Sequence, residues 1–202
     1  MRKKIFSIIL CSMLFVGLVG CGKGNDESAG GGTGNGSETA GGEVDVADAT
    51  ELLTKVWDTY EEAELFPVGG GDFDNVVADA PGKYDVSKTV DMDSVLGLPE
   101  SSAGLIDDAA SMMHMMNANT FTAGAFHLKD AGEQQALADA LKDNIMNRQW
   151  ICGFPDTLII VSVGNEYLVS AFGNAEIIET FKTKLLSQYE MAQVVYEESL
   201  VQ

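Results

Sequence analysis

Basic side chains are scarce in this sequence. The 202 residues contain 12 Lys and Arg against 31 Asp and Glu, a formal charge of −19 at pH 7. Three of the basic residues and none of the acidic ones lie in the first 20 positions, so the rest of the chain carries a formal charge of −22. Nucleic acids and anionic lipid headgroups are bound through Lys and Arg. The sequence therefore excludes nucleic acid as a partner, and we interpret the acidity as a solubility feature.

The apolar run near the amino terminus is too short to span a membrane. Residues 5–19 would extend about 22 Å as a helix, whereas the hydrocarbon core of a bilayer is roughly 30 Å thick. The run follows the basic segment 1–4 and ends in Leu18-Val19-Gly20-Cys21. A basic segment, an apolar core and small residues before a cleavage site are typical of a secretory signal peptide. We therefore predict that residues 1–20 are a signal peptide and that the chain is exported.

The cysteine that ends this run resembles the lipobox cysteine of bacterial lipoproteins. In that class the signal peptide is cleaved ahead of the cysteine, whose thiol receives a diacylglycerol. The resemblance implies that Cys21 begins the mature protein and carries acyl chains such as palmitate. The alternative is an ordinary signal-peptidase site with an incidental cysteine, for which an A-x-A sequence is expected. Because two acyl chains anchor far more stably than one, we predict a protein held on the extracytoplasmic face of the cell membrane.

A tether is predicted to follow Cys21. Residues 22–43 contain nine glycines in 22 positions and no large apolar side chain, which is typical of flexible linkers. A chain of this kind reaches roughly 25 Å from its anchor. The composition changes abruptly at Val44. Residues 44–202 are sufficient for a single globular domain that buries roughly two-thirds of its unfolded surface.

The mature chain has too few cysteines for an internal disulfide. Of the three, Cys11 is lost with the signal peptide and Cys21 is acylated, which leaves Cys152 alone. Stability must then come from an apolar core. A nucleophilic thiol needs a neighbouring base, and the spacing of the two histidines, His114 and His127, does not bring either one to Cys152. We interpret Cys152 as a small buried hydrophobic residue, with a reactive or metal-binding thiol as the alternative.

The spacing of apolar residues predicts an α+β fold. Residues 66–100 are rich in aspartate, glycine and proline and are expected to form a long irregular loop with at most one short strand, at 86–90. A succession of strand, helix and strand favours a parallel crossover, and the turn at 164–166 favours a hairpin. We expect a small mixed sheet with helices packed on it, in the order α-α-β-α-β-β-α. The predicted helices cover 48–64, 102–117, 130–147 (capped by Asp130 and Glu133) and 174–189 (capped by Asn174), and the predicted strands cover 120–128, 157–163 and 167–172.

A run of sulfur-containing residues at 112–116, Met-Met-His-Met-Met, is the first candidate for a metal site. Thioether and imidazole groups suit Cu(I), and zinc is a second option. Consecutive residues of a helix are about 100° apart, so at most two or three could meet at one ion. Methionine also fills core gaps. We interpret the run as core packing. Copper or zinc handling by Met113, His114, Met116 and Cys152, and a partner-binding surface, are the alternatives.

Other polar residues show no specific catalytic pattern. The aspartates of 72–75 and 91–97 do not have the spacing of an EF-hand, and we interpret them as turn-forming rather than calcium-binding. His127 shares a strand face with Phe121 and is predicted to be a hydrogen-bonded packing residue. The sequence contains no G-x-S-x-G, H-E-x-x-H, G-x-x-x-x-G-K-[ST] or paired C-x-x-C motif. No catalytic residue or cofactor is predicted.

Several features together resemble the small lipoproteins of Firmicutes, especially Clostridia, that carry a domain of unknown function. They are the lipobox at Cys21, the glycine-rich tether, the sequence at 112–119 and Cys152-Gly153-Phe154-Pro155. The resemblance covers roughly residues 45–190 and implies location and fold. We expect a non-enzymatic module that binds a surface protein, peptide or small solute. Metal handling and a cell-wall or peptide hydrolase that uses loop carboxylates are the alternatives.

Overall fold

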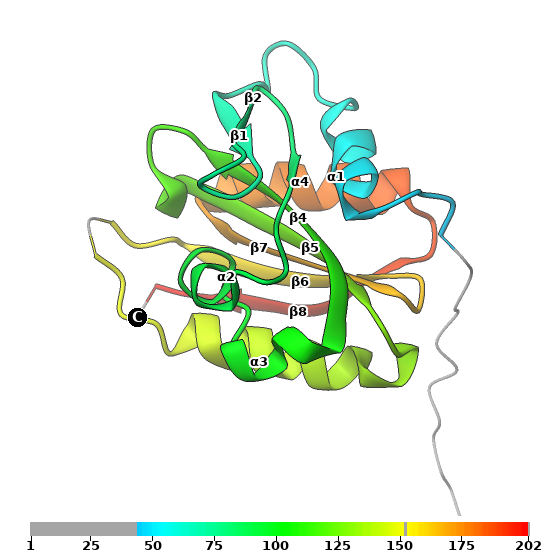
Figure 1. The fold of residues 1–202 in the computed structure, drawn as a ribbon. Helices are drawn as coiled ribbons and strands as arrows, with labels where there is room; N and C mark the ends of the chain where they lie inside the picture. Colours follow the sequence, from blue (N-terminus) through cyan, green and yellow to red (C-terminus); the bar gives the residue numbers. More distant parts are fainter. Residues whose placement is uncertain (1–43, 152, 202) are drawn as a thin grey trace, which may run out of the picture. The chain divides into compact units, whose positions relative to one another are not determined.

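An eight-stranded sheet lies at the centre of the computed structural model, which describes residues 44–151 and 153–201. The strand order is β2-β1-β4-β5-β7-β6-β8, and β3 pairs with β4 beside β1 (Figure 1). All of the described pairings are antiparallel. The strands are β1 (Val68–Gly70), β2 (Val77–Ala78), β3 (Gly82–Lys83), β4 (Ile106–His114), β5 (Phe121–Leu128), β6 (Thr157–Val163), β7 (Tyr167–Gly173) and β8 (Ala192–Ser199).

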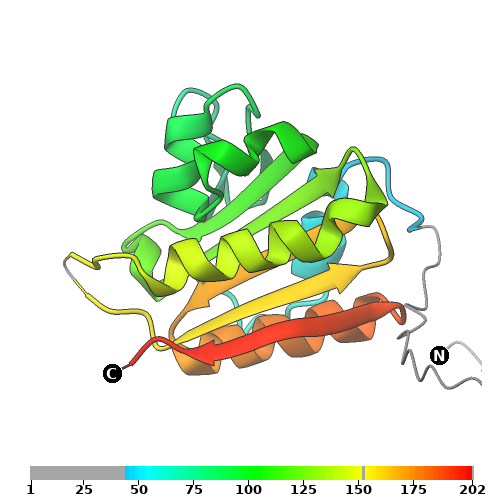
Figure 2. The same cartoon turned by 90° about the horizontal axis from the view of Figure 1, so that it is seen from below.

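Helices cover both faces of this sheet (Figures 1 and 2). One face carries α1 (Ala49–Trp57) and α4 (Ala175–Gln188), and the other carries α2 (Thr89–Leu96) and α3 (Gln134–Met146). Short 3-10 helices are Glu100–Leu105, Ala118–Thr120 and Ala131–Glu133. Within the described residues, none of the helices has the length and apolar character needed to cross a membrane. The predicted signal peptide, Cys21, the tether and Cys152 lie outside the described residues.

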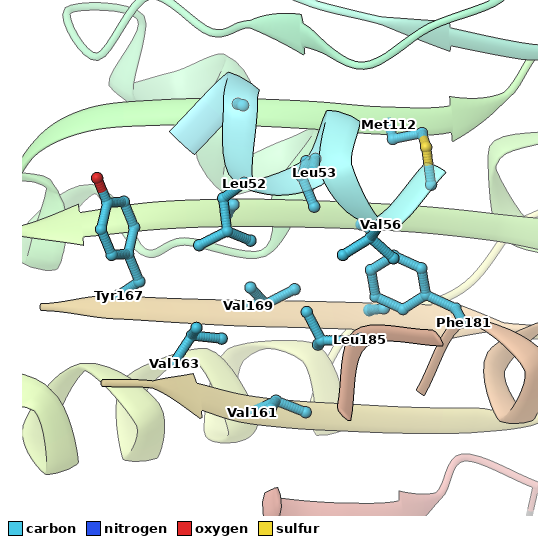
Figure 3. Close-up of a cluster of buried hydrophobic side chains, with 14 of the residues drawn as sticks. Leu52, Leu53, Val56, Met112, Val161, Val163, Tyr167, Val169, Phe181 and Leu185 are labelled. Carbon is cyan, nitrogen blue, oxygen red and sulfur yellow. The ribbon is translucent and has the colours of Figure 1, made fainter. Parts of the chain in front are cut away.

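The first core lies between the sheet and the helix pair α1 and α4. Figure 3 shows Leu52, Leu53 and Val56 of α1 directed toward side chains of the central strands and of α4. Phe121 of β5 packs edge-on against Phe181 of α4, with ring centroids 5.3 Å apart. Each large apolar side chain buried in this way contributes about 1.5–3 kcal/mol to stability. This core is the main reason why α1 and α4 remain on the sheet.

The second core fills the opposite face, because side chains of a strand alternate between faces. Leu158 and Ile160 of β6 contact this side, whereas Ile159 and Val161 contact the first core. Within the described residues 44–151 and 153–201 the sheet is covered by a core on each face, so this part of the chain carries its own hydrophobic core. The α+β class is confirmed.

The helix predicted at 102–117 is wrong: most of this segment is strand β4. The bulge between Ile106 and Asp108 inserts one residue, which brings Ile106 onto the same face as Ala109. Met113 lies four residues after Ala109 and so shares that face by ordinary alternation. Spacings of three and then four residues imitate a helix here, although their cause is a bulged strand.

The predictions for the segment 66–100 and for the direction of the strands are also wrong. The segment contains β1, β2, β3 and α2 instead of an irregular loop, and 86–90 is not a strand. The sheet is antiparallel among the described strands, so the expected parallel crossover is wrong, and β8 was missed. The first helix ends at Trp57, earlier than predicted.

Other local predictions are confirmed. Strand β5 and the β6–β7 hairpin have nearly the expected bounds. The Asn174 side chain accepts hydrogen bonds from the backbone N–H groups of Glu176 and Ile177 and so caps α4. The Asp130 side chain accepts from the N–H of Gly132 and caps the 3-10 turn that leads into α3. These signals are local, which explains why they could be read from the sequence. The predicted capping box is wrong in its second half, because the Glu133 side chain makes no capping hydrogen bond to α3.

Candidate binding groove

A groove of about 420 Å³ lies on the α2 side of the sheet, where β4 and β5 are connected. We call it the β4–β5 groove. It is lined by residues 69–73 with Val76, by Ser94 and Val95, by 113–119 with Thr122, and by Arg148 with Phe172. Both ribbon views place the β4–β5 connection at the end of the sheet away from Val44, where the described chain begins (Figures 1 and 2). The groove therefore lies far from the point at which the predicted tether joins the domain.

Close backbone contact shapes one wall of the groove. Strand β1 pairs with the outer edge of β4 through Gly69 and Gly70, and β3 pairs with the same edge further along. A Cβ atom added to Gly70 would lie 2.1 Å from the backbone nitrogen of Gly82 and 2.4 Å from the carbonyl carbon of Pro81. Only glycine permits this approach. The wall thus depends on a residue without a side chain.

The buried carboxylate of Asp72 organises the loop after this wall. It accepts hydrogen bonds from the Lys88 ammonium at 2.5 Å and from the backbone N–H of Asp74 at 2.9 Å. Asn75 and Asp85 donate to it at 3.3–3.4 Å. Asp72 is only 2 % exposed. The Lys88 ammonium is the main reason why the pKa of Asp72 falls from 3.8 to about 2, and the same contact raises the pKa of Lys88.

Replacing Asp72 by asparagine is expected to lower stability at pH 7 and to weaken the acid sensitivity of the fold. Because the folded-state pKa of about 2 lies below the ordinary value of 3.8, the carboxylate stabilises the protein above about pH 4. This contribution is lost as the pH falls from about 4 to about 2. Urea unfolding measured between pH 7 and pH 2 should therefore show a smaller decrease for Asp72→Asn.

Asp74→Asn provides the matched control for this measurement. The Asp74 side chain also contacts Lys88, at 2.6 Å, but it is 80 % exposed. Exposed ion pairs contribute little to stability because solvent screens them. Asp74→Asn should therefore retain the acid sensitivity of the unaltered protein. Identical pH profiles for Asp72→Asn and the unaltered protein would contradict the assignment.

Large apolar side chains surround the groove without being buried. Phe73 is 67 % exposed, Val76 62 %, Met115 55 % and Met116 81 %. Ile151 and Phe154 are also exposed. Their segment is linked to the groove, because the side chain of the groove residue Asn119 donates to the carbonyl oxygens of Ile151 and Gly153. Clusters of this kind on a protein surface mark binding sites more often than isolated exposed residues do. The groove and its rim form one apolar surface.

The structure separates the residues of the methionine-rich run. Met112 is fully buried in the first core, which agrees with core packing, whereas Met113, Met115 and Met116 line the groove. His114 also borders the groove, but its ring stacks on Phe66, 5.4 Å between centroids. Its Nδ1 atom accepts a hydrogen bond from the Met116 N–H at 3.1 Å. Core packing thus accounts for only part of the run.

The aspartates of 72–75 and 91–97 were also considered as metal ligands. Among the described residues, no group of three His, Cys, Asp or Glu side chains could hold a metal ion. Residues 91–96 belong to α2, and Asp93 accepts a hydrogen bond from the Asn144 amide at 3.0 Å. Asp72 is the only carboxylate among the described groove-lining residues, and Lys88 neutralises it. The described lining of the groove therefore does not present a pair of carboxylates.

His127 lies away from the groove. Its Nδ1 atom is 2.5 Å from a carboxylate oxygen of Asp107. Its ring packs against Tyr167, with centroids 4.9 Å apart. Both contacts agree with the predicted packing role.

Arg148 is the groove residue that sequence reasoning missed. It follows α3, and its guanidinium lies beside the rings of Trp150 and Phe172, which contact each other. It is the only arginine beyond the predicted signal peptide. The sequence feature that could have indicated this residue is a single arginine two positions before Trp150 in a strongly acidic chain. Nothing local, however, indicates that this arginine lines the same groove as the segment 69–76.

Comparison of the chain with protein-family models, with curated proteins and with solved structures gave no match.

Proposed function

We propose that this protein is a lipid-anchored binding module of the extracytoplasmic face of the cell membrane, and that the β4–β5 groove holds an apolar ligand. The observation that carries the second part is a groove of about 420 Å³ whose rim contains four exposed, large apolar side chains. Ligand pockets typically measure about 300–1,000 Å³ and are lined mainly by apolar groups. The first part rests on the lipobox-like sequence that ends at Cys21.

The polar groups around the groove favour binding over catalysis. The Thr122 hydroxyl donates to the carbonyl oxygen of Ala118 at 2.9 Å, and the carboxylate of Asp72 is held by Lys88. A nucleophile needs a base within hydrogen-bonding distance. Both of these groups instead maintain the shape of the groove. They support a site that positions a ligand by its apolar surface.

Introducing a charge at the rim should weaken binding of a neutral apolar probe. We expect Val76→Asp to lower the affinity for N-phenyl-1-naphthylamine about tenfold, because a bound probe would desolvate the new carboxylate. Fluorescence titration of residues 22–202 measures this affinity without acyl chains or a bilayer that would take up the probe. The described part carries both cores, so this chain is expected to fold.

Val90→Asp makes the same chemical change outside the groove. Val90 is 63 % exposed, nearly the same as Val76 at 62 %, and lies in the first turn of α2. Its affinity for the probe should stay within about twofold of the unaltered protein, since the carboxylate remains in water. Equal losses in the two variants, or no binding by the unaltered protein, would refute an apolar ligand site in the groove.

A further inference from the structure

The side chain of Arg148 is held in a defined position at the groove. Its guanidinium carbon is 5.2 Å from the Trp150 ring centroid and 5.8 Å from that of Phe172. One of its N–H groups donates to the backbone carbonyl of Asp93 near the end of α2. Phe172 itself lines the groove and is almost fully buried. The guanidinium is therefore fixed against the apolar wall of the groove.

Most of the hydrogen-bonding capacity of this guanidinium is unused by the described residues. A guanidinium has five N–H donors, and the Asp93 carbonyl is the only acceptor recorded for it. Of the eight Lys and Arg side chains described, six lie within 4.0 Å of a carboxylate. Arg148 is not among those six, although acidic side chains far outnumber basic ones. Burial lowers the pKa of Arg148, and the nearby charge of Asp93 opposes this effect.

No opposing negative charge within the groove competes for this position. Asp72 is the one carboxylate among the described lining residues, and it is bonded to Lys88. The remaining lining groups near Arg148 are apolar or neutral, such as Phe172, Val95 and Ser94. The charge of Asp93 also acts on Arg148, but Asp93 is outside the described lining and its two carboxylate oxygens accept hydrogen bonds from the Asn144 amide and the Glu100 N–H. An anion in the groove would thus meet the remaining donors of Arg148 beside apolar side chains. An arginine fork suits the two oxygens of a carboxylate in particular.

We propose that the β4–β5 groove binds a small monocarboxylate with an apolar body, such as a medium-chain fatty acid, and that Arg148 binds its carboxylate. The apolar chain would contact Phe73, Met113 and Met115 along the groove. The proposal rests on the groove being a ligand site, as proposed above, and adds the chemical class of the ligand. Charge complementarity carries the addition: among the described lining residues the groove offers one cation without a carboxylate within 4.0 Å, next to a mainly apolar lining.

Decanoate and its neutral analogue decanamide test this recognition. Isothermal titration of residues 22–202 should show decanoate binding at least about tenfold more tightly than decanamide, because charge-assisted bonds are roughly twice as strong as neutral ones. In Arg148→Met, which keeps an apolar side chain of similar length, this preference should fall to within about twofold. Decanamide affinity should change little. Arg148→Lys keeps the charge without the fork and should show an intermediate preference.

The outcomes separate this proposal from the more general one. Equal affinities for decanoate and decanamide in the unaltered protein would overturn carboxylate recognition and leave an apolar groove. Parallel loss of both ligands in Arg148→Met would assign Arg148 a structural role as a tie between α3 and α2, and would also overturn the proposal. Binding of an apolar peptide with a free but not an amidated carboxyl terminus, without decanoate binding, would replace the small ligand by a peptide. Failure of decanoate, decanamide and the naphthylamine probe alike would refute the groove as a ligand site.

Discussion

Replacing Gly70 by alanine is expected to destabilise the protein by about 3 kcal/mol, the upper end of the usual range for overpacking. The added Cβ would lie 2.1–2.7 Å from backbone atoms of Gly82, Pro81 and Ala80. Backbone cannot rotate away as a flexible side chain can, so β1 or β3 must move off the edge of β4. Thermal unfolding should show a loss of about 6–12 °C, since about 1 kcal/mol corresponds to 2–4 °C at this size.

Gly104→Ala is the control for this substitution. A Cβ atom at Gly104 meets nothing within 4 Å, so stability should be unchanged or slightly higher because the unfolded chain loses freedom. Gly70→Ala should also weaken binding of the naphthylamine probe, since Gly70 forms a groove wall. Equal unfolding temperatures for the two alanine variants would contradict the close contact of β1 with the chain before β3.

Replacing Cys21 by serine is expected to abolish acylation of the protein completely. A serine hydroxyl cannot form the thioether to diacylglycerol on which lipoprotein anchoring depends. Each buried CH2 of an acyl chain contributes about 0.8 kcal/mol to membrane binding, and stable anchoring requires more than one chain. Labelling of cells with an alkyne analogue of palmitate should mark the unaltered protein and leave the Cys21→Ser variant unmarked.

The other cysteines provide controls for the labelling. Cys11→Ser changes a residue inside the predicted signal peptide, and Cys152→Ser changes the free thiol of the mature chain. Both variants should be labelled like the unaltered protein, because neither residue occupies the lipobox position. Labelling of Cys21→Ser, or a mature amino terminus that lacks a lipid in the unaltered protein, would refute the anchor.

Strand β4 shows where sequence reasoning reached its limit. The methionines and alanines of 106–116 were compatible with a helix because a bulge shifts the alternation by one residue. A bulge depends on the partner strand, here β5, and no local pattern of residues announces it. Because of this error, Met113, Met115 and Met116 were assigned to a helix, whereas in the structure they line the groove. In contrast, β6 and β7 were predictable because unbroken apolar runs separated by a tight turn need no information from elsewhere.

The segment 66–100 shows a second limit. Its strands β1, β2 and β3 contain two or three residues each, too few for a periodicity to be recognised. β1 and β3 are held by pairing with β4, and β2 by pairing with β1. The contacts of Asp72, whose partners Lys88 and Asp85 lie 13–16 residues away, hold the loop that follows β1. Glycine and aspartate usually indicate a loop. Here Gly70 allows β1 to approach the backbone at Pro81 and Gly82, and Asp72 binds the Lys88 ammonium.

The sequence alone was sufficient to predict the export signal, the caps at Asp130 and Asn174 and the α+β class, and it shows the shortage of cations directly. The shortage of cations is a count of residue types, and the others depend on neighbours a few positions apart within one element. The antiparallel topology and the groove were decided by the tertiary structure alone. Arg148, Phe73 and Met113 belong to different segments, and only the packing of α2 and α3 on one face of the sheet, with the pairing of β1 to β4, brings them to the same cavity.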